Sequence, residues 1–255
     1  MKLGEHNFLE YLGNEEQNLL TSIVNFKSEF DLFYNIDRIY QEPLKRLVVS
    51  SDDVVVPQLY LFVHFHLYFS MSCLLRSHLS ETLSSLRKAI DASLCAYKII
   101  LEPSKSVAYL DRDRYFQFIK SNIQREIGKD SSLYPLAHDL LKIHDACSEY
   151  GSHSDISSFF HRLETKETDD KKRDILLVHY FQFPRNPEEY KFYYLTTLQG
   201  FYSMFLIFKL FLDQNLKIID PKWESTINHL GPLLNKLRKE SFAKFNGNPS
   251  SGSRG

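Results

Sequence analysis

The spacing of apolar residues predicts amphipathic helices through the first 150 residues. Between residues 83 and 101 the apolar positions recur at steps of three and four, which places them on one face of an α-helix. They are Leu83, Leu86, Ile90, Leu94, Tyr97 and Leu101. The same spacing runs over residues 133–150 and stops at Gly151. No glycine occurs from residue 14 to residue 127, which favours long helices separated by prolines. The pattern leaves open whether residues 58–101 form one helix or two.

Start and stop signals predict further helix ends. A helix is expected to begin at Asn14, whose side chain can cap the helix. The two glutamates that follow it suit the first turn, where the helix dipole is positive. Residues 111–127 present an apolar face and end at Gly128. Ser132 is expected to cap the next helix, with Pro135 in its first turn.

After residue 151 the period of the pattern changes. Residues 158–163 and 175–183 are rich in β-branched and aromatic side chains, as strands are, and residues 164–174 between them are highly charged. The sequence therefore predicts one small β-hairpin over about residues 158–183, with a long solvated loop.

Two helices are expected after the hairpin. Asn186 and Pro187 are a cap and a first helical residue, and Asp220 and Pro221 open a last helix. Gly231 followed by Pro232 should kink or break that helix. The whole pattern predicts a mainly α protein: a single helical bundle domain of about seven helices over residues 1–245, followed by a disordered C-terminal tail over residues 246–255.

Two apolar stretches have the length of a membrane span. Residues 54–75 contain no Asp, Glu, Lys or Arg, and residues 192–212 contain only Lys209. Both stretches also contain polar side chains, and their tyrosines run through the middle instead of gathering at the ends as a membrane belt does. A helix that is apolar on all sides is equally expected at the centre of a soluble bundle. We therefore interpret both as core helices and expect no membrane association.

Composition excludes several classes of function. Glycine is scarce, with 9 of 255 residues, and is not clustered, which argues against phosphate-binding loops and doubly wound dinucleotide folds. The formal net charge of −1 lacks the basic excess typical of a nucleic-acid-binding domain, so no nucleic-acid partner is expected. The three cysteines have no C-x-x-C spacing and lie among apolar residues, which indicates free thiols in a reducing compartment. The polar N-terminus lacks the order of a signal peptide, and a cytoplasmic location is expected.

The ten histidines do not predict a metal site. No two of them stand three or four residues apart on a predicted helix, and no H-E-x-x-H motif occurs. His64 and His66 would point about 200° apart around a helix. We expect neither a metal nor a cofactor.

The best candidate site lies where residues 144–155 gather polar and titratable groups. Glu149 lies two residues before Gly151, and His153 lies two residues after Gly151. The histidine could therefore lie near a carboxylate in a cleft. Arg87 and Asp91, four residues apart on the amphipathic helix, could face this turn. The same serine, aspartate and glycine residues are also what a helix end and the next cap require. The candidate catalytic residues are thus Arg87, Asp91, Glu149 and His153.

Two segments resemble a known group of proteins. The first segment is LRKAIDA at residues 86–92 with AY at residues 96–97, and the second is CSEYGSH at residues 147–153. Both are similar to uncharacterised bacterial helical proteins, which themselves resemble the HEPN superfamily. Several HEPN domains are ribonucleases. The resemblance covers about residues 60–160. It implies a helical bundle that commonly dimerises, with the helix of Arg87 and Asp91 beside the turn of His153.

The ribonuclease activity of that superfamily is not expected here. Its active members carry an arginine, then a polar residue, and then a histidine after four to six intervening positions. Arg173, Asp174 and His179 match this spacing, but they fall on a predicted strand where the family motif needs a helix. An extended chain places Arg173 and His179 near 20 Å apart, at ~3.3 Å per residue, which is too far for joint action on one phosphodiester.

Two hypotheses about function remain. The first is a non-catalytic protein that acts by association with itself or with a partner protein, because 36 aromatic residues exceed what a core needs. The second is an enzyme or small-ligand-binding protein with a site between the helix of Arg87 and Asp91 and the turn at residues 149–155. An arginine with two carboxylates and a histidine could bind a polar or anionic molecule or serve in acid–base catalysis.

Overall fold

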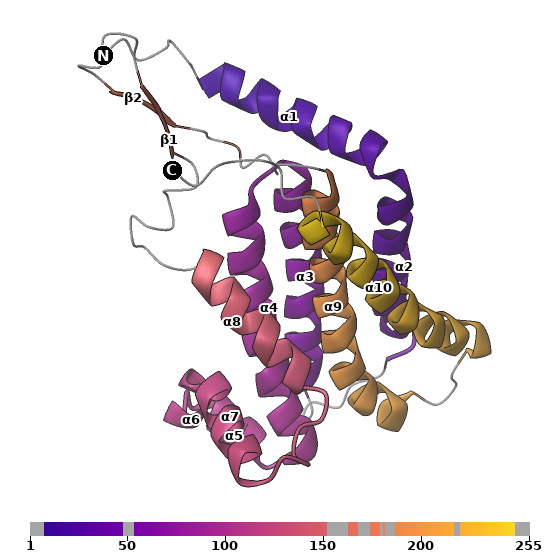
Figure 1. Ribbon diagram of the computed structural model, residues 1–255. Coiled ribbons are helices and arrows are strands. Elements are labelled where there is room, and N and C mark those ends of the chain that lie inside the picture. The colour runs from indigo at the N-terminus through magenta and orange to yellow at the C-terminus, as the bar shows by residue number, and fades with distance from the viewer. Residues whose placement is uncertain are drawn as a thin grey trace.

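The computed structural model describes residues 8–47, 54–151, 163–167, 174–178, 181, 187–216 and 220–247. These ranges contain ten helices and two short strands (Figure 1). The helices are α1 (Phe8–Asn25), α2 (Lys27–Leu44), α3 (Val55–Leu75), α4 (Leu79–Leu101), α5 (Lys105–Leu110), α6 (Arg114–Gln117), α7 (Ile119–Lys129), α8 (His138–Gly151), α9 (Pro187–Asn215) and α10 (Pro221–Gly247). The strands are β1 (Leu163–Glu167) and β2 (Asp174–Val178). The protein is mainly α-helical, as the apolar spacing predicts.

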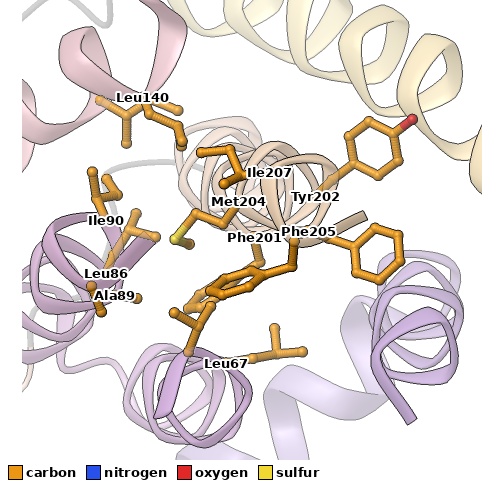
Figure 2. Close-up of a cluster of buried hydrophobic side chains, with 14 of the residues drawn as sticks. Leu67, Leu86, Ala89, Ile90, Leu140, Phe201, Tyr202, Met204, Phe205 and Ile207 are labelled. Atoms are coloured by element: carbon orange, nitrogen blue, oxygen red, sulfur yellow. The ribbon is translucent and has the colours of Figure 1, made fainter. Parts of the chain in front are cut away.

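The helix α9 runs through the middle of the bundle. It packs against α2, α3, α4, α8 and α10, and Figure 2 shows its side chains pointing toward several of these neighbours at once. Tyr194, Leu198, Phe201, Phe205 and Phe208 are fully buried. No position of α9 from residue 188 to residue 212 is exposed, and a helix that is mostly buried can be apolar on most of its faces, which explains the long apolar run of this segment.

Many of the aromatic residues serve this core. The hydroxyl of Tyr40 donates to the carbonyl of Phe201 at 2.7 Å, and the hydroxyl of Tyr60 donates to the carbonyl of Tyr40 at 2.6 Å. The hydroxyl of Tyr190 donates to the carbonyl of Leu74 at 2.8 Å. A tyrosine can be buried when its hydroxyl finds such an acceptor. The aromatic excess is therefore largely used inside the bundle.

Residues 58–101 lie on two helices, α3 and α4, which pack along each other. The chain reverses at Ser77, whose φ of 65° is left-handed, and the amide of His78 donates to the carbonyl of Cys73 at 2.9 Å. A left-handed residue just after the helix, with this hydrogen bond, is a common helix ending in which glycine is the usual choice. Here a serine occupies the position, so the end of α3 carries no glycine signal in the sequence.

Gly231 and Pro232 are predicted to kink or break the last helix, and a break does not occur, because α10 is continuous from Pro221 to Gly247. A Cβ atom on Gly231 would lie 2.7 Å from the ring and hydroxyl of Tyr202 on α9. The hydroxyl of Tyr202 donates to the carbonyl of Ile227 at 3.0 Å. The glycine thus permits a close approach between α9 and α10.

The predicted count of about seven helices is too low, and several predicted ends are displaced. The segment 111–127 is divided at Phe118, whose φ of −118° and ψ of 37° are not helical, into α6 and α7. The first helix begins at Phe8 and not at Asn14, and α8 begins at His138 and not at Ser132. The start of α9 at Pro187 agrees with the sequence.

The strands β1 and β2 pair antiparallel, with Leu163 opposite Val178 and Glu167 opposite Asp174. They lie inside the range 158–183, but β1 covers part of the charged segment that was expected to be a loop. Arg173 and His179 lie outside the described residues. So do residues 248–255 of the expected tail, whose first two residues, Asn246 and Gly247, belong to α10.

Candidate functional site

A cavity of about 640 Å³ opens between α3, α4, α7 and α8, with α5 and α6 at one end. Much of its wall is apolar and aromatic. This part comprises Val55, Leu59, Phe62, Tyr109, Phe116 and Phe118. Small-molecule sites typically have volumes of roughly 300–1,000 Å³ and mostly apolar walls with a few polar groups. The cavity has these properties.

The polar wall of the cavity is built by three helices. Arg87, Lys88 and Asp91 come from α4, Lys120 from α7 and His144 from α8. Arg87 and Asp91 share one face of α4 because residues four apart on a helix are neighbours. Three positively charged side chains and one carboxylate therefore line the same space.

His144 is fixed against α4 by Asp91. The Nε2 atom of His144 lies 3.1 Å from Oδ1 of Asp91, and the hydroxyl of Ser148 donates to the carbonyl of His144 at 2.8 Å. The His144 side chain is only 3% exposed, whereas Asp91 is partly open to solvent. This pair joins α4 to α8 and orients the histidine ring in the cavity wall.

Lys120 is also held by a carboxylate. Its ammonium group donates to Asp145, so the pair links α7 to α8 beside the His144 contact. The pair therefore joins α7 to α8 at this wall of the cavity.

The two buried cysteines near this wall are not nucleophiles. Burial, together with a smaller contribution from the charge of Asp91, raises the pKa of the Cys95 thiol, which lines the cavity, to about 12. Burial likewise raises the pKa of Cys147 to about 12, with Arg87 opposing this increase. A thiol attacks as its thiolate, so both are inert near neutral pH.

The structure brings only part of the predicted site together. Arg87 and Asp91 both line the cavity. Glu149 lies in the last turn of α8, its side chain outside the described residues, and His153 is also outside them. The histidine that meets Asp91 is His144, which precedes the predicted His153 by nine residues in the sequence. His144 follows Ile143 on the side of α8 that faces α4, and only this position on a predicted helix could have indicated its role.

Among the residues that the structure describes, no three His, Cys, Asp or Glu side chains gather closely enough to hold a metal ion. The carboxylate of Asp91 is already engaged by His144. The described residues of the cavity therefore offer charged and apolar groups for a ligand.

A second notable feature is the outward face of α3, next to the cavity. Leu61, Phe62, Phe65, Tyr68 and Phe69 recur at helical spacing and are each 42–60% exposed. We call these five residues the aromatic face. Phe62 also lines the cavity. Exposed apolar groups collected on one helix often mark a binding surface.

A buried polar group supports the aromatic face from below. The ring of His66 lies 4.4 Å from that of Phe62 and 5.4 Å from that of Phe65, and its Nδ1 is 2.7 Å from the hydroxyl of Ser85 on α4. Burial lowers the pKa of His66, and the charge of Lys88 lowers it further. His66 is thus held as a neutral ring between α3 and α4.

Two helices, α3 and α9, are long and apolar enough to cross a membrane by length and composition alone. In α9, 67% of the most apolar window is buried, and in α3 the fraction is 56%. The apolar character of α9 is accounted for by its central position. That of α3 exceeds what its buried side needs, because the aromatic face points outward.

The fold and the cavity define a mainly α-helical protein with a central helix and a charged, aromatic-lined cavity at its side. No family model, curated protein or solved structure matches the chain. The resemblance to HEPN domains accordingly stays a prediction, and function must be argued from the surface and the cavity themselves.

Proposed function

We propose that this is a non-catalytic cytoplasmic protein that acts by association with a second copy of itself through the aromatic face of α3. The observation that carries the proposal is that Leu61, Phe62, Phe65, Tyr68 and Phe69 lie together, about half exposed, on the outer side of a packed helix. Exposing this much apolar surface to water is unfavourable, and covering it would stabilise an assembly.

A second copy suits the chemistry of this face. Residues 54–75 contain no charged side chain, so two identical faces can meet without like-charge repulsion. A two-fold interface uses the same patch on both subunits and must therefore be complementary to itself. An uncharged aromatic surface meets that condition, whereas a patch rich in one charge would not.

The size of the face is compatible with the core of an interface. With ~150–250 Å² for a whole aromatic side chain, the half-exposed residues present roughly 400 Å² per copy. A standard interface buries about 800 Å² per partner. Further exposed rings flank the face: Tyr34 reaches it through Phe33, whose ring is 6.3 Å from that of Tyr68, and Phe118 shares the cavity wall with Phe62. The aromatic face would form the centre, and these rings would extend it.

Light scattering after size exclusion tests the proposal on the full chain at micromolar concentration. We expect the unaltered protein to be a dimer, and Phe65→Ser with Phe69→Ser to raise the dimer dissociation constant by at least about tenfold, as the loss of buried aromatic contacts does. Leu20→Ser on α1 is the matched control, because Leu20 is 59% exposed and Phe65 is 60% exposed. The control should leave the dimer unchanged.

Three results would overturn the proposal. The first is a strict monomer at micromolar concentration. The second is a dimer that Phe65→Ser with Phe69→Ser weakens no more than Leu20→Ser does. The third is a monomer that sediments with phosphatidylcholine vesicles and loses this binding in the α3 variant, because the face would then cover lipid. Thermal unfolding of each variant shows whether it remains folded.

A further inference from the structure

The charged groups in the wall of the cavity beside α4 are mostly engaged within the protein. Asp91 contacts His144, and Lys120 forms an ion pair with Asp145. Arg87 also has an interaction partner. A charged ligand would have to compete with these existing contacts, and separating such partners is unfavourable. The engaged groups therefore do not favour an ion in the cavity.

Lys88 is the remaining charged residue of the lining, and it is exposed to solvent on α4. An exposed ammonium group stays hydrated, and salt screens its charge, so an ion pair with it is worth little. We therefore expect Lys88 to contribute little to the affinity for a molecule inside the cavity.

The rest of the wall is largely apolar, and much of it is aromatic. Phe62 and Phe118 line it together with Tyr109 and Phe116, whose rings meet edge to face with centroids 5.3 Å apart. The thiol of Cys95 stays protonated because burial raises its pKa to about 12, and a protonated thiol behaves as a small apolar group. Water against such a wall finds few hydrogen-bond partners, so its displacement by an apolar ligand is favourable.

From this arrangement we infer that the cavity is a binding site for an uncharged aromatic small molecule. The rings of the ligand pack against Phe116 on α6 and Phe118 at the α6–α7 junction, since ring pairs are stabilised beyond the area that they bury. The volume of about 640 Å³ accommodates two or three fused or linked rings. Gln58 and Gln117 are exposed members of the lining whose amides can hydrogen-bond with one neutral polar substituent.

The inference is independent of the proposed association. Phe65 and Phe69 belong to the aromatic face and do not line the cavity. Ala92 and Ser121 line the cavity and do not belong to the aromatic face. Variants of the two pairs therefore report on different surfaces, and the failure of one proposal can be told from the failure of the other.

Two fluorescent probes with the same rings test the preference for an uncharged ligand. N-phenylnaphthylamine is neutral, whereas anilinonaphthalene sulfonate carries a negative charge. Each is titrated into the full-length protein, and the stoichiometry and the dissociation constant are measured. We expect one neutral probe per chain, bound at least about tenfold more tightly than the sulfonate, because a charge placed against an apolar wall without a partner is unfavourable.

Two substitutions that fill the cavity locate the bound probe. Ser121 is an exposed lining residue of α7, and Ala92 is a buried lining residue of α4. Ser121→Trp and Ala92→Phe should each weaken the neutral probe at least about tenfold, because the new ring occupies space that the probe needs. Ser225→Trp is the matched control, since Ser225 is an exposed serine of α10 outside the lining, and it should change the affinity less than about twofold.

Thermal unfolding shows whether each variant remains folded, and the exposed position of Ser121 keeps the test decisive if Ala92→Phe unfolds. The inference is overturned if the neutral probe shows no saturable binding, or if the sulfonate probe binds more tightly than the neutral one. It is also overturned if Ser121→Trp binds the neutral probe as tightly as Ser225→Trp does. Loss of binding in Phe65→Ser with Phe69→Ser, but not in Ser121→Trp, would instead place the probe on the aromatic face.

Discussion

Replacing Gly231 by alanine tests the close approach of α10 to α9, on which the bundle depends. The new Cβ atom would lie 2.7 Å from both Cε1 and the hydroxyl oxygen of Tyr202. Real side-chain carbons do not come this close, so either the ring or α10 must move. The ring is buried, and its hydroxyl donates to the carbonyl of Ile227 at 3.0 Å. Moving it therefore endangers that hydrogen bond as well.

The expected cost follows from three contributions. Overpacking a well-packed site costs ~1–3 kcal/mol, and a lost hydrogen bond costs about 1 kcal/mol. Alanine regains about 1 kcal/mol over glycine inside a helix. Gly231→Ala should therefore lower the free energy of unfolding by about 1–3 kcal/mol, which for a chain of this size lowers Tm by roughly 2–10 °C.

Two other glycines provide a graded comparison. At Gly13 on α1 no atom lies within 4 Å of an added Cβ, so Gly13→Ala should raise the free energy of unfolding by about 0.5–1 kcal/mol. At Gly200 on α9 the added Cβ would lie 3.1 Å from the flexible end of the Leu86 side chain. The change in the free energy of unfolding for Gly200→Ala should therefore fall between the changes for Gly13→Ala and Gly231→Ala. The measurement is urea and thermal unfolding followed by far-ultraviolet circular dichroism.

The ring itself can be altered to check the cause. Gly231→Ala in a Tyr202→Leu background should cost less than in the unaltered protein, because a shorter side chain leaves room for the Cβ. The packing argument is wrong if Gly231→Ala is as stable as Gly13→Ala, or if its cost is the same with and without the Tyr202 ring.

Two further predictions concern buried polar groups. The ammonium of Lys98 donates to Glu126 at 3.1 Å and to the Tyr134 hydroxyl at 3.0 Å, so Lys98→Met should lower the free energy of unfolding by about 2–3 kcal/mol, since a half-buried carboxylate loses its partner. Glu126→Gln in the Lys98→Met background should recover part of this in urea unfolding, and no recovery would contradict the ion-pair explanation. Burial, aided by the charge of Lys88, lowers the pKa of His66 below its ordinary value of 6.5, so the folded state resists protonation of this ring. The stability that the neutral ring contributes above pH 6.5 is therefore lost as the pH falls toward the pKa in the folded state. The stability difference between the unaltered protein and His66→Asn should therefore shrink from pH 7 to about pH 5, and a constant difference would refute a buried neutral ring.

The sequence predicts long amphipathic helices well, because their pattern repeats enough times to be recognised. The face of α4 over residues 83–101 and the start of α9 at Pro187 are examples. Short elements carry no such repetition. The helices α5 and α6 span six and four residues, and the break at Phe118 depends on a single residue's backbone angles. A local pattern cannot separate these from one continuous helix.

The relative position of the two most apolar segments also escaped prediction. Residues 54–75 and 192–212 are similar in length and apolar content, and the sequence predicts a core helix for each. Only packing distinguishes them, since no residue of α9 from 188 to 212 is exposed, whereas α3 leaves the aromatic face open. An apolar composition indicates that a helix surface is shielded from water, but it does not show whether other helices of the same chain or a binding partner shield it.

The candidate site shows the same division between local and long-range information. Arg87 and Asp91 could be placed on one face of a helix from their spacing alone. Their partner could not, because the contact of Asp91 with His144 joins residues that are 53 positions apart. The polar cluster around His153 was conspicuous in sequence, whereas His144 lies at an ordinary position on the apolar side of α8. Depth in the fold, which no local pattern records, makes His144 the histidine of the cavity.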